Sequence, residues 1–290
     1  MHPTHELTRI VVVGAGTMGH GIAQVAAHSG FKVALVDQDE AALARATKKI
    51  EENLAGGIER GKLAESDRER VLANLTTTRD LAAAAHDAGL VIEAIFEDLT
   101  AKHGVFQAAE AAAPHAAILA SNTSSLPIAR IAATLKRPER VIGMHFFNPV
   151  HLMKLIEIVV HPGTGDAARH VALDVAKRMG KEPIVVKDSP GFATSRLGVI
   201  LGLEAMRMVE QGVASAADID AAMVLGYNHP MGPLKLTDLV GLDVRLAIAD
   251  TLAHEIGGDQ YRAPKILRDM VARGELGKKS GKGFYDWKQG

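Results

Sequence analysis

Three features of the sequence predict an α/β protein with a doubly wound sheet, mostly parallel with an antiparallel edge, followed by an all-α C-terminal domain. Up to residue 188, short apolar runs rich in β-branched residues alternate with segments of helical periodicity, which is typical of a sheet whose strands are joined by helices. A glycine-rich turn directly follows the first of these runs. Beyond residue 189 the pattern is almost entirely helical, which predicts a bundle.

Composition narrows the class of protein. The 290 residues are 47% hydrophobic, enough for two cores, and we place the domains at residues 1–188 and 189–290. A formal charge of −1 gives no basic surface for nucleic acid or an anionic membrane. Cysteine is absent and the 13 histidines form no HExxH pattern, so we expect neither disulfide nor metal. With no signal segment and no apolar run near about 18 residues, we expect a cytoplasmic protein.

The first apolar run, Arg9 to Val13, leads into a GxGxxG turn that opens a helix ended by Gly30. Glycines at these positions allow a tight turn and let the backbone approach a pyrophosphate, which then lies at the positive end of the helix. The turn supplies six candidate cofactor-binding residues: Gly14, Ala15, Gly16, Thr17, Met18 and Gly19. An ordinary strand-to-helix turn is the alternative.

The next strand, KVALVD, ends at Asp37, eighteen positions beyond Gly19 (37 − 19). An acid at this spacing accepts hydrogen bonds from the adenosine ribose hydroxyls, which together with the glycine turn predicts a Rossmann-like dinucleotide site. The residues that follow, Gln38, Asp39 and Glu40, supply no cation for a 2′-phosphate. The sequence therefore favours NAD over NADP.

From residue 39 to about residue 74 the pattern is helical, with glycine breaks, and predicts an inserted helical pair. The lysines and arginines of this segment are most simply interpreted as solvent-exposed.

Leu90 to Ile95 resumes the sheet, and Asp98 can cap a helix that runs to about Ala113. Residues 118–120 form the next strand, and the hydroxyl-rich segment 121–125 lies at its carboxyl end, where open α/β sheets bind ligands. A capping cluster for the next helix is the alternative.

The segments Val141 to Phe147 and Lys154 to Val160 read as a strand, a loop and a returning strand. Antiparallel pairing about a loop centred near His151 sets His145 opposite Glu157. A carboxylate beside an imidazole can fix its tautomer and stabilise its protonated form, the arrangement of a general base with an orienting partner. A solvent-facing pair at a hairpin end is the alternative.

Several motifs resemble those of the 3-hydroxyacyl-CoA dehydrogenase family: SNTSS at 121–125, HFFNP at 145–149, DSPGF at 188–192, MGPLKLTDLVGLD at 231–243 and KKSGKGFYDW at 278–287. The acid twelve positions after the histidine (157 − 145) fits as well. The resemblance covers nearly the whole chain and is greatest to the stand-alone 3-hydroxybutyryl-CoA dehydrogenases. It implies NAD-dependent oxidation of (S)-3-hydroxyacyl-CoA to 3-oxoacyl-CoA, and the reverse, by a homodimer formed through the helical domain. It permits a role in fatty-acid β-oxidation or in the degradation of aromatic acids.

The resemblance also implies roles for individual residues. His145 and Glu157 would form the catalytic dyad, Ser124 would contact the reacting oxygen and the cofactor, and Asn148 would lie on the nicotinamide side. Further cofactor contacts would come from Glu97, Lys102 and Lys279, and contacts with CoA from Asn53, Arg60, Lys102 and Ser124. The acyl-CoA substrate is thus the partner that this interpretation requires.

One residue departs from the family pattern. After PGF the chain reads ATSR, so Ser195 stands where family members commonly carry Asn. We include Ser195 among the catalytic candidates, although serine is shorter and lacks the amide carbonyl. Two rival functions stay open at this point, a related NAD-dependent hydroxyacid or sugar-acid dehydrogenase that does not use CoA and a non-catalytic NAD-binding protein.

Overall fold

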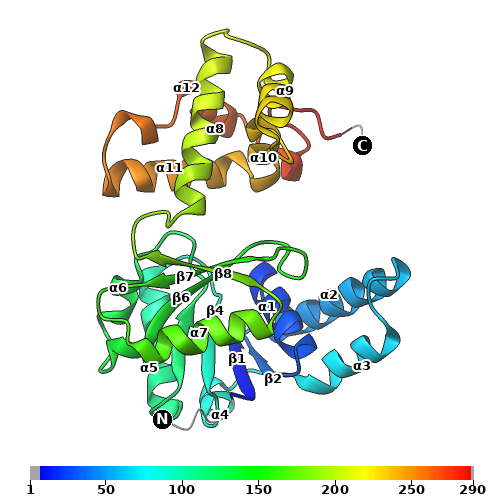
Figure 1. Ribbon diagram of the computed structural model, residues 1–290, viewed down its shortest axis with the longest axis vertical. Helices are drawn as coiled ribbons and strands as arrows, with labels where there is room; N and C mark the ends of the chain where they lie inside the picture. Colours follow the sequence, from blue (N-terminus) through cyan, green and yellow to red (C-terminus); the bar gives the residue numbers. More distant parts are fainter. Residues whose placement is uncertain (1–6, 289–290) are drawn as a thin grey trace. The chain divides into compact units, whose positions relative to one another are not determined.

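The computed structural model describes residues 7–288. The chain forms two compact units, Met1–Asp188 and Ser189–Gly290. The first unit is built on a sheet and the second is helical (Figure 1). The two units are described separately below.

The sheet of the first unit has eight strands in the order β3-β2-β1-β4-β5-β6-β7-β8. Neighbouring strands are parallel except for β6 and β7, which pair antiparallel. This confirms the prediction of a mostly parallel sheet with an antiparallel edge. The chain order reverses between β1 and β4, a switch point at which open α/β sheets bind ligands. The strands are β1 (Arg9–Val13), β2 (Lys32–Val36), β3 (Leu75–Thr78), β4 (Leu90–Glu93), β5 (Ile118–Ser121), β6 (Val141–Phe146), β7 (Leu155–Val160) and β8 (Glu182–Lys187).

Helices cover the sheet and contribute to its core (Figure 1). α1, α2, α3 and α7 share one hydrophobic cluster with the strands, whereas α5 and α6 contact β4, β5 and β6. Side chains of Asp39, Asp80 and Asp98 accept hydrogen bonds from the first turns of α2, α4 and α5, which fixes where these helices begin. The helices are α1 (Thr17–His28), α2 (Glu40–Glu59), α3 (Glu65–Asn74), α4 (Leu81–Ala85), α5 (Leu99–Ala112), α6 (Ile128–Ala132) and α7 (Asp166–Arg178), with a 3₁₀ turn η1 (Pro138–Arg140).

Strand β3 was not predicted from the sequence. Its four residues, LTTT, are partly or fully exposed, so they lack the continuous apolar run that marks a buried strand. β3 is an edge strand that is held by pairing with β2. The short helix α4 that follows it was not predicted either.

The second unit consists of α8 (Thr194–Glu210), α9 (Ala216–Tyr227), α10 (Pro233–Val240), α11 (Leu242–Glu255) and α12 (Lys265–Ala272), with 3₁₀ turns η2 (Asp259–Tyr261) and η3 (Lys278–Ser280). The helices pack around their own apolar core, as predicted. Gly241, at φ 105°, separates α10 from α11. Across residues 7–288, each helix is too short or too polar to cross a bilayer.

A buried carboxylate anchors the C-terminal segment of this unit. Asp238 of α10 is fully buried and accepts hydrogen bonds from the backbone N–H of Phe284 and Tyr285, both at 2.9 Å, and from the indole N–H of Trp287 at 2.8 Å. These bonds hold residues 284–287 against α10. They also restrain the segment that carries Lys279.

Candidate active site

The glycine turn between β1 and α1 has the geometry that a dinucleotide needs. Gly14 adopts φ 106°, and a Cβ atom there would lie 2.6 Å from the carbonyl oxygen of Ala94. A Cβ on Gly19 would lie 1.7 Å from the Gly14 oxygen. At Gly16, in contrast, no heavy atom lies within 4 Å of a Cβ position, so the backbone at the start of α1 is open to an incoming phosphate. This open cradle fits the pyrophosphate of a dinucleotide.

Asp37 lies just beyond β2, beside this turn. Its Oδ2 accepts a hydrogen bond from Ala15 N–H at 2.7 Å, and its Oδ1 accepts one from Asp39 N–H at 2.9 Å. The carboxylate is thereby fixed, and each oxygen keeps a lone pair for a ribose hydroxyl. The sheet also places Arg79 nearby, because Asp37 N–H donates to the Thr78 oxygen at 3.3 Å. This cation follows the unpredicted strand β3, so the local sequence after Asp37 did not reveal it.

His145 on β6 lies opposite Glu157 on β7 in the antiparallel register, which confirms the predicted pairing. His145 Nδ1 and Glu157 Oε2 are 2.7 Å apart, and the side chains of His145 and Glu157 are 8% and 0% exposed. The Phe147 ring packs against the imidazole, with centroids 4.5 Å apart. A buried carboxylate at this distance accepts the Nδ1 proton and leaves Nε2 as the nitrogen that can take a proton from a substrate.

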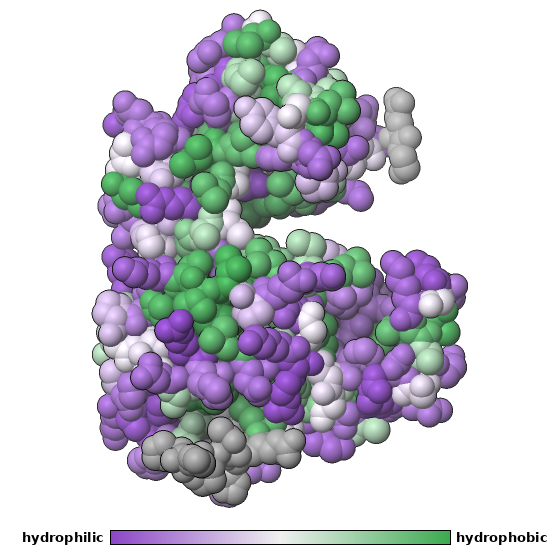
Figure 2. Space-filling model, viewed as in Figure 1, coloured by the Kyte–Doolittle hydropathy of each residue, from purple (hydrophilic) through white to green (hydrophobic). Residues whose placement is uncertain are grey.

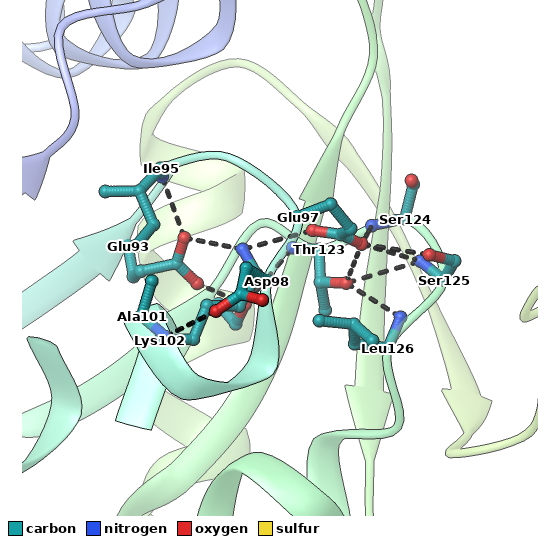
Figure 3. Close-up of polar contacts among 11 residues, drawn as sticks. Glu93, Ile95, Glu97, Asp98, Ala101, Lys102, Thr123, Ser124, Ser125 and Leu126 are labelled. Carbon is teal, nitrogen blue, oxygen red and sulfur yellow. Dashed lines mark hydrogen bonds and ion pairs between the residues drawn. The ribbon is translucent and has the colours of Figure 1, made fainter. Parts of the chain in front are cut away.

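The segment after β5 is organised by Glu97, as Figure 3 shows. Glu97 Oε1 accepts hydrogen bonds from the backbone N–H groups of Ser124 and Ser125, both at 3.2 Å, and from the Ser125 hydroxyl at 3.0 Å. The Thr123 hydroxyl also donates to this oxygen. The Ser124 hydroxyl points away from Glu97 in Figure 3. The network therefore fixes the backbone of Ser124 while its hydroxyl can bond a ligand.

Charge keeps Glu97 ionised in this setting. Burial opposes ionisation, but the ammonium group of Lys102 and the hydroxyls of Thr123 and Ser125 outweigh it, so the pKa of Glu97 lies below its ordinary value. Lys102 Nζ lies 3.1 Å from Glu97 Oε2 and 2.7 Å from Glu93 Oε1.

Lys102 lies deeper in the protein than expected for a residue that contacts cofactor and CoA. Its side chain is 1% exposed, as is that of Glu93, so its ammonium group has almost no surface to offer a ligand. Glu93 in turn accepts from Ile95 N–H at 2.8 Å and from the Ser121 hydroxyl at 2.7 Å. Lys102 therefore links two carboxylates and holds Glu97 in place. Sequence reasoning missed Glu93, which reads as one more residue of a buried strand.

The loop between β6 and β7 is held in place by side chains that lie outside it in the sequence. Lys181, buried after α7, donates to the backbone oxygens of Val150 and of Met153, the latter at 2.8 Å. Burial lowers the pKa of Lys181. At the start of the loop, Asn122 Oδ1 accepts from Phe146 N–H at 2.9 Å. These contacts position the exposed Asn148, and no pattern in the sequence indicated Lys181.

Two of the candidate CoA residues, Asn53 and Arg60, lie on or next to α2. Asn53 Nδ2 donates to Gln24 Oε1 of α1 at 3.0 Å, and Arg60 at the end of the helix is exposed. The pKa of His151 is lowered, first by burial and then by the positive charges of Lys181, His20, Arg60 and Lys49. Lys181, Arg60 and Lys49 thus bring positive charge close to the loop after β6, and such charge attracts phosphate groups.

Two candidates lie in the second unit. Ser195 is half-buried in the first turn of α8. Lys279 Nζ lies 2.6 Å from Asp243 Oδ1. Burial raises the pKa of Asp243, but the hydrogen bond from Lys279 outweighs it and the pKa is lowered. Residues 7–288 contain no cluster of three or more side chains that could hold a metal ion.

Comparison with known proteins gives matches along the whole chain. Residues 9–189 match the NAD-binding domain of 3-hydroxyacyl-CoA dehydrogenase, and residues 191–287 match its C-terminal domain. The chain is 44% identical over 284 residues to the probable 3-hydroxybutyryl-CoA dehydrogenase of Bacillus subtilis, covering 98% of this chain and 99% of the relative. It is 43% identical to the mitochondrial hydroxyacyl-coenzyme A dehydrogenase of Homo sapiens, covering 96% of this chain and 91% of the relative.

Solved structures give the same result. FadB2 of M. tuberculosis superposes with a TM-score of 0.93 at 43% identity, covering 97% of this chain and 99% of that one. The (S)-3-hydroxybutyryl-CoA dehydrogenase PaaH1 of Ralstonia eutropha also superposes with a TM-score of 0.93, at 38% identity, and covers 98% of this chain and 100% of that one.

Proposed function

Since the chain belongs to the 3-hydroxyacyl-CoA dehydrogenase family, we propose that His145 and Glu157 perform the proton transfer of the family's reaction. The chain is an NAD-dependent enzyme that oxidises (S)-3-hydroxyacyl-CoA to 3-oxoacyl-CoA and catalyses the reverse reaction. The observation that carries the proposal is the 2.7 Å contact between His145 Nδ1 and a fully buried Glu157 carboxylate.

In the oxidation, His145 acts as the general base. Its Nε2 takes the proton of the C3 hydroxyl while Glu157 stabilises the positive charge that develops on the ring. NAD, when bound, supplies the hydride acceptor. The hydroxyl of Ser124, whose backbone is fixed through Glu97, donates to the reacting oxygen. In the reduction the protonated His145 returns the proton, and this acid–base participation typically contributes about 10²- to 10⁴-fold.

We propose that the NAD site combines the glycine turn with side chains at the carboxyl ends of β2, β4 and β6. The open backbone at Gly16 and the fixed carboxylate of Asp37 support this. Glu97 and Asn148 contribute from the neighbouring loops. Lys279, in the second unit, is a further cofactor residue by the resemblance, whereas the burial of Lys102 supports a positioning role for it.

We propose that Asn53 and Arg60 contact the CoA moiety. The positive charges that lower the pKa of His151 support this, because the adenosine diphosphate part of CoA is anionic. The names of the relatives support 3-hydroxybutyryl-CoA as one substrate, and fatty-acid β-oxidation fits this class of reaction. Ser195 is the residue of the second unit that we propose contacts the substrate.

Steady-state oxidation of NADH tests the function. We expect turnover with acetoacetyl-CoA and none with free acetoacetate, since the CoA contacts would be lost. A series of 3-oxoacyl-CoA substrates from four to sixteen carbons would define the preferred chain length. Equal rates with acetoacetyl-CoA and free acetoacetate would refute the use of CoA.

We further propose that the second unit mediates a homodimer. Figure 2 shows apolar residues among the hydrophilic ones on this unit. On α9, Leu225 and Tyr227 are 84% and 76% exposed, and such residues in contact with water favour association. Replacing Leu225 with Asp should shift the sedimentation coefficient toward that of a monomer. A wild-type protein that sediments as a monomer at micromolar concentration would refute the proposal.

A further inference from the structure

Two histidines of the first unit keep ring nitrogens that can still bond a ligand. His20 lies in the first turns of α1, and its Nδ1 donates to the backbone oxygen of Gly16 at 2.9 Å. This leaves its Nε2 without a hydrogen-bond partner within residues 7–288. His151, half-buried in the loop between β6 and β7, makes no hydrogen bond through its ring in that part of the chain. Each imidazole therefore has at least one nitrogen available as a donor when protonated.

Packing brings this loop against the start of α1. A Cβ atom on Gly21 would lie 2.9 Å from Cβ of Val150, so the residues next to His20 and His151 are in contact. Lys181 holds the loop in this position by donating to the backbone oxygen of Val150. The positive charge of His20 is one of the influences that lower the pKa of His151, as expected of two imidazoles that lie near each other.

The same face of α1 also meets the CoA candidates of α2. Gln24 lies four residues after His20, on the same helix face and about 6 Å further along the axis, and accepts a hydrogen bond from Asn53 Nδ2 at 3.0 Å. A Cβ atom on Gly56 would lie 3.1 Å from Arg60 Nη1, so the guanidinium group folds back along α2 toward Asn53. These side chains and the two imidazoles form a donor cluster: His20, Asn53, Arg60 and His151.

The surroundings of the donor cluster are basic. The charged or titratable side chains that act most strongly on His151 are Lys181, His20, Arg60 and Lys49. One of them, Lys49, is paired with Glu52 at 3.0 Å. Burial, followed by these positive neighbours, lowers the pKa of His151, so its ring is mostly neutral at pH 7. An anion bound among these groups would offset their repulsion and favour the protonated imidazole.

We propose that His20 and His151 bind the diphosphate of CoA, and that their rings take up protons from solvent when it binds. This rests on the proposed function, which places CoA at Asn53 and Arg60. A diphosphate diester is anionic and has no proton to exchange near pH 7, whereas a protonated imidazole gives it a charge-assisted hydrogen bond. We assign the rings to CoA rather than to the diphosphate of NAD because His20 shares its helix face with Gln24, which is bonded to Asn53.

Calorimetry measures this proton uptake directly. The ligand is (S)-3-hydroxybutyryl-dephospho-CoA, which keeps the diphosphate and lacks the titratable 3′-phosphate. It is titrated into the protein without NAD at pH 7, in buffers that differ in their enthalpy of ionisation, and the dependence of the heat on the buffer gives the number of protons taken up. We expect at least about half a proton per ligand in wild type, because an imidazole whose pKa rises past 7 on binding gains most of a proton.

Matched variants identify the groups that take up the protons. His20→Gln and His151→Gln should each reduce the uptake and the double variant should abolish most of it, because glutamine keeps an N–H donor but does not titrate. In the double variant the KM for acetoacetyl-CoA should rise by about three- to tenfold, with little change in kcat or in the KM for NADH. His170→Gln, at an exposed histidine of α7, is the control and should keep the wild-type uptake.

A measurement on wild type alone tests the same idea without relying on the folding of a variant. The ratio of kcat/KM for acetoacetyl-dephospho-CoA to that for acetoacetylpantetheine, which lacks the diphosphate, should rise as the pH falls from 8 to 6, because the rings become protonated. A ratio independent of pH, uptake that survives in the double variant, or imidazole-dependent uptake with NADH instead of the CoA ligand would each overturn this inference while turnover of acetoacetyl-CoA leaves the proposed function intact. No turnover of any 3-oxoacyl-CoA would overturn the proposed function itself.

Discussion

Replacing Glu157 with Gln tests the dyad most directly, because it removes one charge and keeps nearly the same shape. The wild-type carboxylate is 0% exposed and lies 2.7 Å from His145 Nδ1. A hydrogen bond to a charged group contributes about 1.5–3 kcal/mol, and a neutral amide stabilises a protonated imidazole far less than a carboxylate does. If this whole loss of about 1.5–3 kcal/mol appears in the transition state, kcat should fall by roughly 10- to 150-fold.

The assay is the rate of NADH oxidation with acetoacetyl-CoA over a range of pH. Reduction requires protonated His145, so in Glu157→Gln the loss of activity on the alkaline side should begin at a lower pH than in wild type. Glu182→Gln is the control, since Glu182 is a 76% exposed carboxylate on the adjacent strand β8 and should leave both rate and profile unchanged. If Glu157→Gln behaves like this control, the His145–Glu157 pair has no part in the proton transfer.

Four further predictions concern other residues of the candidate site. The kcat/KM for NADH should exceed that for NADPH by at least about tenfold, because the Asp37 carboxylate would face the 2′-phosphate with like charge. Asp37→Ala should reduce this difference, chiefly by weakening the binding of NADH. Equal kcat/KM values for the two cofactors in wild type would refute the proposed role of Asp37. Lys102→Met should lower the free energy of unfolding in urea by about 3–5 kcal/mol, since it strands Glu93 and Glu97 without a counter-ion, and a change below about 1 kcal/mol would contradict the network. The pKa of Glu97 is lowered from 4.5 in the fold, so its contribution to stability should be complete above that pH and be lost as the pH falls below it, which melts between pH 7 and pH 3 would detect. Ser195→Ala should cost about 1–3 kcal/mol of transition-state stabilisation if the hydroxyl bonds substrate, with Ser195→Asn near neutral, and full activity of both variants would exclude this residue from the site.

Several features of the site could be read from the sequence because they depend on local order. The glycine turn needs its strand before it and its helix after it, and both are adjacent in the chain. The pairing of His145 with Glu157 follows from a short hairpin, in which the loop itself fixes the register. The family membership rests on motifs that are contiguous in the sequence, and the comparisons confirmed it.

Other features depend on residues that meet only when distant segments fold together. Glu93 and Lys102 come from a strand and the following helix, and only their shared burial turns a predicted ligand contact into an internal ion pair. Lys181 holds a loop about thirty residues earlier in the sequence, which no local pattern could encode. Arg79 reaches the neighbourhood of Asp37 through an edge strand too polar to be recognised.

Arg245 is the clearest example of this division. In the sequence it is one of 33 lysines and arginines, and a cation on a helix is ordinarily solvated. In the fold, α11 instead buries Arg245 against Gly198 of α8, and within residues 7–288 no acceptor bonds its Nε. The sequence alone determined most of the strands and helices, the cofactor class and the pairing of His145 with Glu157, because these depend on contiguous patterns. Which charged groups are buried, and which of them lack a partner, was decided only by the tertiary structure, because burial is a property of packing between segments that are far apart in the chain.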